Sequence, residues 1–146
     1  MPTVNFLVET ELPPGAVLAT LTDFSDRRPT LYGNIDRAHF KLHDQGAGWA
    51  DVTEGKALAW ERSRYDWDAA AGRVTVQTIE SDSWRQGSRW EYRLTPRGGG
   101  THVDVTVVRL PRTLRGRLIA LGLPLLGRRV LRRDLENLLA RSAPRP

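Results

Sequence analysis

The chain has 146 residues, a length that suits one core with a pocket, so we expect residues 1–146 to form a single domain. It contains no cysteine, which excludes disulfides, thiol catalysis and thiolate metal sites. The formal net charge is +5, but Lys41 and Lys56 are the only lysines among 22 basic residues. We therefore attribute much of this charge to a GC-rich coding bias and expect no nucleic-acid partner.

The N-terminal part predicts one strand followed by two short helices. Apolar residues alternate with polar ones over residues 3–8, which is typical of a strand with one buried face. Pro14 favours a helix start, because proline is tolerated in the first turn. Arg28 precedes Pro29 and favours the end of that helix, because the residue before a proline is displaced from helical geometry. A second short helix is expected over residues 26–32.

Six further strands are predicted from apolar alternation, and a long helix follows them. The clearest pair is the hairpin from Trp90 to Val107, whose arms alternate around a run of three glycines. From Arg112 to Arg141 the apolar residues recur at helical spacing, with a break expected near Pro124. The six strands are expected at residues 36–43, 48–54, 57–68, 73–80, 83–95 and 101–110.

This order of elements is of the α+β class: one strand, two short helices, six meandering antiparallel strands and a long C-terminal helix. It resembles the helix-grip fold of the START and Bet v 1-like (SRPBCC) superfamily, in particular bacterial proteins labelled polyketide cyclase/dehydrase. The resemblance covers nearly the whole chain and implies a seven-stranded curved sheet wrapped around the C-terminal helix. It implies little about a reaction, because the superfamily holds lipid carriers, hormone receptors, cyclases and coenzyme-Q-related chaperones. The residues that carry it are 12–17, 21–24, Arg28 with Pro29, the Trp90 to Val107 hairpin and the arginine-rich helix.

Each predicted hairpin ties the phase of its two strands, so the face that meets the helix can be predicted. One turn pairs Tyr65 with Val76, and an earlier turn places Val52 beside Phe40. All hairpins agree on one inner set: Phe40, Leu42, Ala50, Val52, Tyr65, Trp67, Val74, Val76, Trp90, Tyr92, Leu94, Val103, Val105 and Val107.

The same phase places polar residues on the inner face. If Glu61 and Glu80 face each other, their like charges raise the affinity of one for a proton, as acid/base chemistry requires. A bulge near Trp84, or an open wet end of the sheet, would instead leave these groups in solvent. The predicted rows are Ser63 with Thr78 and Gln86, then Glu61 with Glu80, and on the other side Tyr65 with Ser88 and Arg109.

An apolar inner face between sheet and helix predicts a cavity for a small, largely apolar or amphipathic molecule. Trp84 is expected at its mouth, where the indole can stack on a flat ligand. The first hypothesis is a binding protein or carrier. The alternative is an enzyme similar to polyketide cyclases or aromatases, with Glu61, Glu80, Tyr65 and Arg109 as catalytic candidates. The predicted ligand-binding residues are Phe40, Tyr65, Trp67, Val76, Thr78, Trp84, Gln86, Trp90, Tyr92 and Val105.

No metal or cofactor site is predicted. His39 and His43 share one strand face, opposite Phe40, and a third ligand is missing. No phosphate-binding loop and no serine nucleophile motif is present. The N-terminus carries no secretory signal, so we expect a cytoplasmic location. The longest apolar run, 118–126, is too short for a membrane span. We expect a monomer or a homodimer. The third and lowest-ranked hypothesis is a surface-interaction protein that uses the basic C-terminal helix on an anionic membrane or on nucleic acid.

Overall fold

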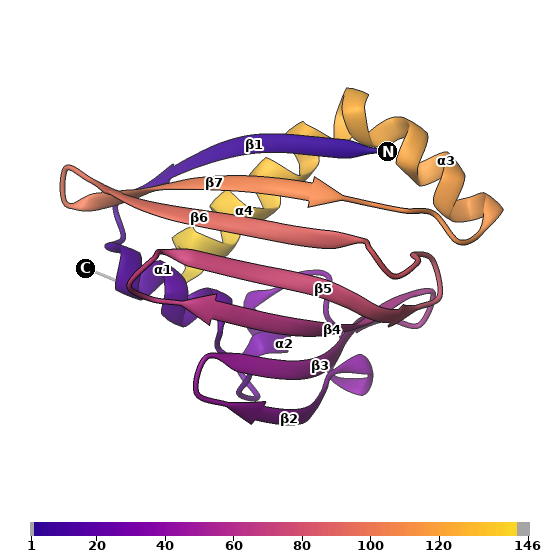
Figure 1. Ribbon diagram of the computed structural model, residues 1–146, viewed down its shortest axis with the longest axis horizontal. Helices are drawn as coiled ribbons and strands as arrows, with labels where there is room; N and C mark the ends of the chain where they lie inside the picture. Colours follow the sequence, from indigo (N-terminus) through magenta and orange to yellow (C-terminus); the bar gives the residue numbers. More distant parts are fainter. Residues whose placement is uncertain (1, 143–146) are drawn as a thin grey trace.

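The computed structural model describes residues 2–142 and contains one seven-stranded antiparallel sheet (Figure 1). The strand order is β1-β7-β6-β5-β4-β3-β2, so the first two strands of the chain form the two edges. The predicted seven-stranded sheet is confirmed. Its strands are β1 (Thr3–Thr10), β2 (Lys41–Gly46), β3 (Trp49–Lys56), β4 (Ala59–Asp68), β5 (Arg73–Ser81), β6 (Arg89–Arg97) and β7 (Gly100–Val108).

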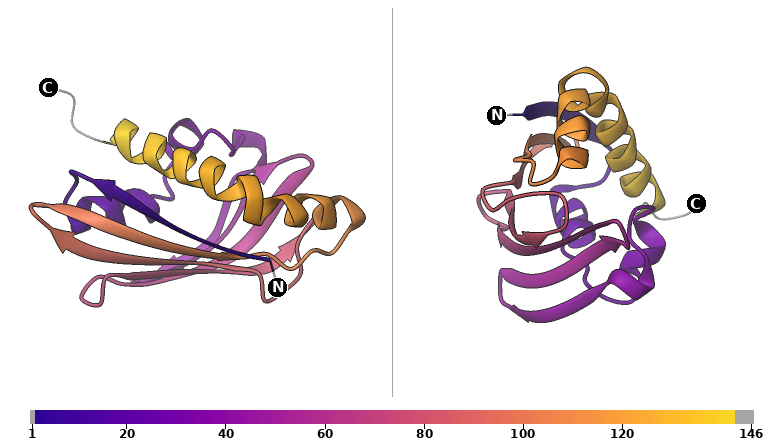
Figure 2. Two further views of the ribbon diagram at one scale, coloured as in Figure 1. Left: turned by 90° about the horizontal axis from the view of Figure 1, so that it is seen from above. Right: turned by 90° about the vertical axis from the view of Figure 1, so that its right-hand side faces the viewer.

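The helices lie on one face of this curved sheet (Figure 2). The longest, α4, runs along that face, and α1 and α2 lie beside it within the curve. The helical elements are α1 (Pro14–Leu21), α2 (Arg28–Leu31), a 3-10 turn (Arg37–His39), α3 (Leu114–Gly122), a π-helical turn (Leu123–Gly127) and α4 (Arg128–Ser142).

The hydrophobic core lies between the sheet and these helices. All fourteen residues predicted to face inward either belong to the core cluster or pack against it. The predicted pairing of Tyr65 with Val76 is confirmed, as is that of Tyr92 with Val105. Gly98 and Gly99, both with positive φ, form the two-residue turn that joins β6 to β7.

Several predicted boundaries are wrong, and local backbone features explain them. Helix α1 ends at Leu21 rather than at Arg28, which instead begins α2. Residues 36–40 are not a strand, because a 3-10 turn occupies 37–39. Val52 pairs with Leu42 rather than with Phe40, and a register shift follows Leu42. The predicted strand 83–95 begins only at Arg89.

The C-terminal helix is interrupted where the sequence predicted a break. The π-helical turn Leu123–Gly127 separates α3 from α4. On α4 the predicted inner stripe is confirmed, since Leu135, Leu138 and Leu139 are buried and Leu131 packs against the core. Within residues 2–142, none of the helices is both long and apolar enough to cross a membrane.

Candidate functional site

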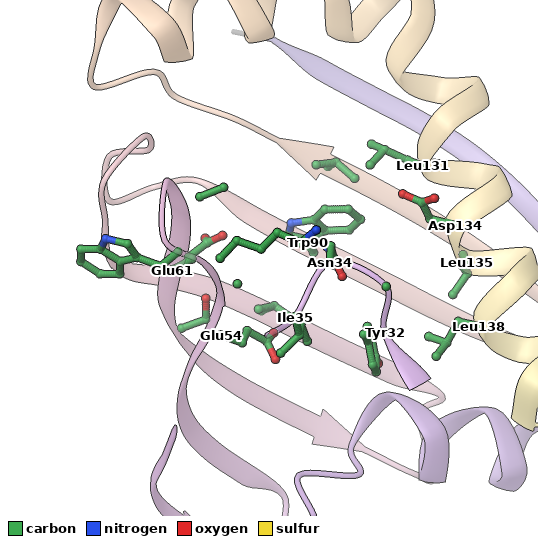
Figure 3. Close-up of a pocket in the computed structure, with 18 of the residues that line it drawn as sticks. Tyr32, Asn34, Ile35, Glu54, Glu61, Trp90, Leu131, Asp134, Leu135 and Leu138 are labelled. Carbon is green, nitrogen blue, oxygen red and sulfur yellow. The ribbon is translucent and has the colours of Figure 1, made fainter. Parts of the chain in front are cut away.

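A cavity of about 610 Å³ lies between the curved sheet and α4. Figure 3 shows Leu131, Leu135 and Leu138 of α4 on one side of this space, with Glu54 and Glu61 across from them. Asp134 and Asn137 of α4 also border it. The sheet contributes Ser63, Tyr65, Val76, Trp90, Tyr92 and Val107. The cavity therefore has a largely apolar wall and a polar end.

Two aromatic rings on β6 form part of the apolar wall. The rings of Trp90 and Tyr92 stack with centroids 6.2 Å apart and an interplanar angle of 12°. Val76 lies opposite Trp90 on β5. Burial, the largest cause, raises the pKa of the Tyr92 phenol, so this ring is neutral at physiological pH. The wall is shaped for a flat, uncharged surface of a ligand.

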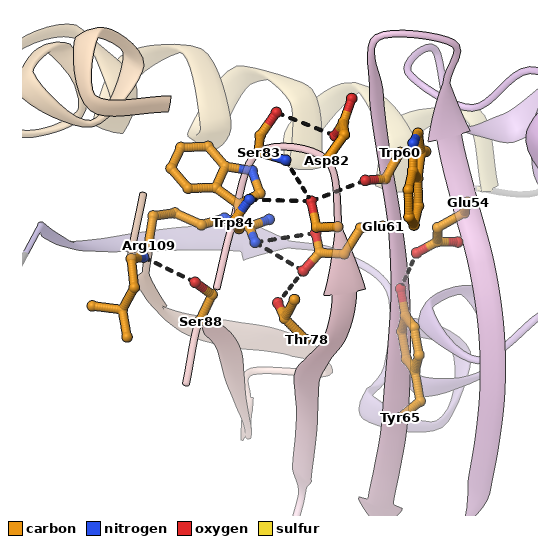
Figure 4. A network of polar contacts seen from close by, with 12 residues as sticks. Glu54, Trp60, Glu61, Tyr65, Thr78, Asp82, Ser83, Trp84, Ser88 and Arg109 are labelled. Atoms are coloured by element: carbon orange, nitrogen blue, oxygen red, sulfur yellow. Dashed lines mark hydrogen bonds and ion pairs between the residues drawn. The ribbon is translucent and has the colours of Figure 1, made fainter. Parts of the chain in front are cut away.

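The polar end contains an ion pair between Arg109 and Glu61 (Figure 4). Arg109 Nη1 donates to Glu61 Oε1 at 2.9 Å and to Oε2 at 3.1 Å, and the Thr78 hydroxyl also donates to Glu61. The Arg109 guanidinium lies 5.1 Å from the ring of Trp84 and 5.4 Å from that of Trp90. Among the described residues, its Nε and Nη2 make no hydrogen bond, so these donors are available to a ligand.

A second ion pair joins Arg28 to Glu54, and it holds Tyr65 in place. Arg28 Nε donates to Glu54 at 2.7 Å, and Nη2 donates to the Tyr65 hydroxyl at 2.9 Å. The Tyr65 hydroxyl in turn donates to Glu54. The guanidinium also lies 4.3 Å from the ring of Tyr32 and 4.6 Å from that of Phe24. This packing buries Arg28 almost completely.

The electrostatics of this cluster keep Arg28 charged and Tyr65 neutral. Burial, the largest single cause, lowers the pKa of the Arg28 guanidinium. The Glu54 charge, Tyr32, Tyr65 and the hydrogen bond to Glu54 together outweigh burial and raise this pKa well above its usual value. Burial and the Glu54 charge together raise the pKa of the Tyr65 phenol well above its usual value. Tyr65 therefore serves as a hydrogen-bond donor rather than as a phenolate.

The two glutamates are direct neighbours across β3 and β4, where Glu54 pairs with Glu61. Residues that face each other in a sheet have Cβ atoms about 4.5–5.5 Å apart. Each carboxylate nevertheless has its own arginine, Arg28 for Glu54 and Arg109 for Glu61. The four charges of these two ion pairs therefore sum to zero.

No family model matches the sequence, and no curated protein sequence matches it. Solved structures do match it. TTHA0849 from Thermus thermophilus has a TM-score of 0.77 at 17% identity, over 97% of both chains. The Zhui aromatase/cyclase from Streptomyces sp. R1128 has a TM-score of 0.77 at 16% identity, over 96% of this chain and 92% of its own. A START superfamily protein from Mycobacterium smegmatis has a TM-score of 0.66 at 12% identity, over 93% of this chain and 98% of its own.

This chain has the helix-grip fold. The fold class inferred from the order of elements is thereby confirmed. At these identities the likeness concerns the fold alone. The ligand of the cavity depends on the residues of this chain and not on the fold.

In the helix-grip cavity, half of the residues predicted to bind a ligand border the open space. These are Tyr65, Val76, Trp84, Trp90 and Tyr92. Phe40, Trp67, Thr78 and Val105 do not border it. Phe40 and Trp67 pack against the core, and Thr78 and Val105 are buried in it. Their predicted place on the cavity wall is wrong because inward-facing side chains of a sheet also fill the core beneath a cavity.

The predicted pair of Glu61 and Glu80 is wrong. A register shift between Arg62 and Ser63 places Glu61 opposite Ser81, and Glu80 opposite Arg62 on the outer face. A bulge of this kind inserts one residue and reverses the phase of everything beyond it. Glu80 is exposed, whereas Glu61 and Arg109 border the cavity as predicted.

Gln86 also lies outside the cavity. It is exposed, and its side chain donates to the backbone oxygen of Ile79. Residues 82–88 form an irregular loop because the Ser81 hydroxyl accepts hydrogen bonds from the backbone nitrogens of Ser83 and Trp84. The predicted row therefore holds only for Ser63 and Thr78, which do pair.

Glu54, Arg28 and Tyr32 were not predicted as site residues. A signal for Glu54 existed, because it continues the inner phase of Ala50 and Val52, but it lies beside Gly55 and resembles a turn residue. Arg28 and Tyr32 begin and follow a four-residue helix that is too short for a periodic pattern. Their place in the cluster depends on the tertiary fold.

Metal ligation finds no support in the part of the chain that the structure describes, where no three histidine, aspartate or glutamate side chains cluster. His43 is exposed and bonds to the Thr53 hydroxyl at 2.7 Å. His39 lies 3.9 Å from Asp36. Neither histidine belongs to the residues that border the cavity.

Proposed function

We propose that the protein binds or carries a small, largely apolar molecule with a neutral polar end in the cavity between sheet and α4. The observation that carries the proposal is a cavity of about 610 Å³ with an aromatic and aliphatic wall and a polar end of balanced charge. Ligand cavities of drug-sized molecules measure about 300–1,000 Å³ and combine apolar walls with a few polar groups.

The polar end favours a hydroxyl or carbonyl group over an ion. Arg109 offers Nε and Nη2 as donors, and Glu54 and Glu61 offer carboxylate oxygens as acceptors. Glu54 and Glu61 are already neutralised by their arginines, so a charged ligand group placed between these two ion pairs would be uncompensated, which is unfavourable for a buried charge. A planar apolar body suits the stacked rings of Trp90 and Tyr92.

Native mass spectrometry of the purified protein tests this proposal. We expect a bound small molecule in the wild type, and its loss in Leu131→Trp, because a larger side chain on the cavity wall fills the space. Ile79→Trp is the matched control, since Ile79 is 36% exposed and does not border the cavity. Both variants should fold, as judged by circular dichroism. Retention of the molecule by Leu131→Trp, or a wild type that holds nothing and binds no planar apolar probe, would contradict the proposal.

A second candidate is an enzyme that resembles the aromatase/cyclases. The supporting observation is the adjacent carboxylates of Glu54 and Glu61, with Tyr65 as a donor, in one cavity. Paired carboxylates of this kind can divide the roles of acid and base. Incubation with a linear polyketone distinguishes the candidates: an enzyme yields a cyclised product and loses turnover, but not binding, in Glu61→Gln. A carrier returns the molecule chemically unchanged.

A further inference from the structure

Five exposed apolar residues lie on α3, the π-helical turn and the start of α4. Leu114, Leu118 and Leu121 are 65–74% exposed, and Leu126 and Val130 are 68% and 56% exposed. On α3 the leucines are spaced by four and three residues, so they lie on one side of the helix. We call these five residues the α3 face. Single exposed apolar residues are ordinary, but three on one side of a nine-residue helix, with two more in the segment that follows, favour an interaction surface.

The α3 face is not a core face that failed to pack. The opposite side of α3 is docked on the protein through Gly116 and Ala120, which are buried. A Cβ added at Gly116 would stand only 2.7 Å from the backbone oxygen of Ser83, so the helix already touches the 81–84 loop. The Thr113 hydroxyl accepts a hydrogen bond from the backbone nitrogen of Gly116 and caps the helix. The leucines are thus held outward by a fixed contact.

Arginines surround the α3 face. Residues 112–133 contain seven arginines and neither aspartate nor glutamate. Arg115 and Arg117 flank the leucines on α3, and Arg128 and Arg129 follow the turn; all four are exposed. Arg115 also donates to the backbone oxygen of Leu58, so the β3–β4 turn, whose Leu58 is 68% exposed, lies beside α3. The surface is apolar at its centre and cationic around it.

We propose that the α3 face docks on a membrane surface that contains anionic phospholipid. An interfacial helix inserts its apolar side chains at the boundary of headgroups and acyl chains, while arginines pair with anionic headgroups. Helix α3 has nine residues, so it lies on such a surface rather than across it. It stands at one end of the molecule, where a flat surface can reach it (Figure 2).

The chemistry of the α3 face disfavours two other partners, a second copy of this chain and nucleic acid. In a symmetric dimer the same patch faces itself, so the arginines of two copies would oppose one another, and residues 112–133 supply no acidic residue to pair with them. Nucleic acid would satisfy the arginines, but it would leave the leucines in water. Only a surface with both anionic groups and an apolar layer matches the whole α3 face.

The end of the molecule that carries α3 also borders the cavity. Ile119 of α3 and Leu123 of the π-helical turn contribute to the cavity wall, on the same segment as the exposed leucines. Docking would therefore bring an end of the cavity against the membrane. The docking itself does not depend on the identity of any ligand, so it can be tested on the protein alone.

Vesicle co-sedimentation tests the inference. We expect the wild type to bind vesicles of phosphatidylcholine with phosphatidylglycerol, and to bind pure phosphatidylcholine vesicles at least about tenfold less. Binding to the anionic vesicles should weaken as the salt concentration is raised. The double variant Leu118→Ser with Leu121→Ser should lose at least about tenfold in binding to the anionic vesicles. The double variant Arg117→Gln with Arg129→Gln should also bind the anionic vesicles more weakly than the wild type. Circular dichroism checks that both double variants are folded.

Matched controls use exposed residues away from α3. Ile79→Ser removes an exposed apolar side chain from β5, and Arg93→Gln removes an exposed arginine from β6. Both should bind vesicles like the wild type. Equal binding by the leucine variant and the wild type would overturn the proposal. So would a dimer in solution that the leucine variant converts to a monomer without any vesicle binding, or binding to duplex DNA in place of vesicles.

Discussion

Arg28 is the largest side chain that this fold buries completely, at 1% exposure. Its guanidinium donates to Glu54 and Tyr65 on the sheet, and to the backbone oxygens of Leu21 and Asp23 at the end of α1. One side chain thereby joins a helix end, a strand and the polar end of the cavity. A buried charge of this kind is tolerated only when its partners are complete.

Removing Arg28 should therefore be costly. We expect Arg28→Met to destabilise the fold by about 3–5 kcal/mol, because Glu54 is left as an uncompensated carboxylate. The matched control is Arg62→Met, whose partner Asp51 lies on a more exposed face, and its cost should stay below about 1 kcal/mol. Urea unfolding measures both. Similar costs for the two variants would mean that the Arg28 pair behaves like a surface ion pair.

At the scale of elements, the bulge between Arg62 and Ser63 decides which carboxylate reaches the cavity. The extra residue is Ile79 of β5, between Thr78 and Glu80. It turns Glu80 to the outer face beside Arg62, whereas Glu61 keeps the regular alternation of β4 and pairs with Arg109. Without this extra residue in β5, Glu61 and Glu80 would face each other as the alternation predicted. This single irregularity removes the predicted pair, while the regular register of β3 and β4 places Glu54 beside Glu61.

Substitution of the two glutamates tests this phase. Glu61→Gln should cost about 1–3 kcal/mol in stability, because a hydrogen-bonded charge pair with Arg109 is lost at the cavity. Glu80→Gln should change stability by less than about 0.5 kcal/mol, as expected for an exposed position. Chemical denaturation of both variants gives the two values. A larger loss of stability in Glu80→Gln than in Glu61→Gln would contradict the bulge and favour the uninterrupted alternation.

Regular elements were predictable, and irregular ones were not. Hairpins with apolar alternation, such as Trp90 to Val107, carry their own phase, so the inner face followed from local pattern. Bulges leave no mark in alternation until the strands are paired, which is why Glu80 was misplaced. Arg28 sits on a four-residue helix without periodicity, and only the tertiary fold brings it to Glu54 on β3.

At the scale of the molecule, the three tyrosines of the chain all belong to the cavity wall. They are Tyr32, Tyr65 and Tyr92. Burial is the largest cause that raises the pKa of each phenol above its usual value of 10.0. Because these pKa values are higher in the folded state than in the unfolded one, the stability linked to them is complete below about pH 10 and falls as the pH rises further.

The titration of tyrosine absorbance should therefore follow unfolding. We expect no phenolate signal from the folded protein near pH 10, and its appearance at higher pH together with the loss of circular dichroism. Free tyrosine in the same buffer serves as the reference. A phenol that titrates near pH 10 while the circular dichroism stays native would show that one ring faces open water.

The strand order has a consequence for how the protein is made. Strand β1 pairs only with β7, from Thr3 with Val108 to Thr10 with Thr101. During synthesis this strand cannot pair until β7, the last strand in chain order, has left the ribosome. Until then Val4, Phe6 and Val8 stay uncovered. An unpaired strand edge with apolar side chains is a template for aggregation. During synthesis the nascent chain is thus most vulnerable to aggregation before β7 emerges, because β7 closes that edge.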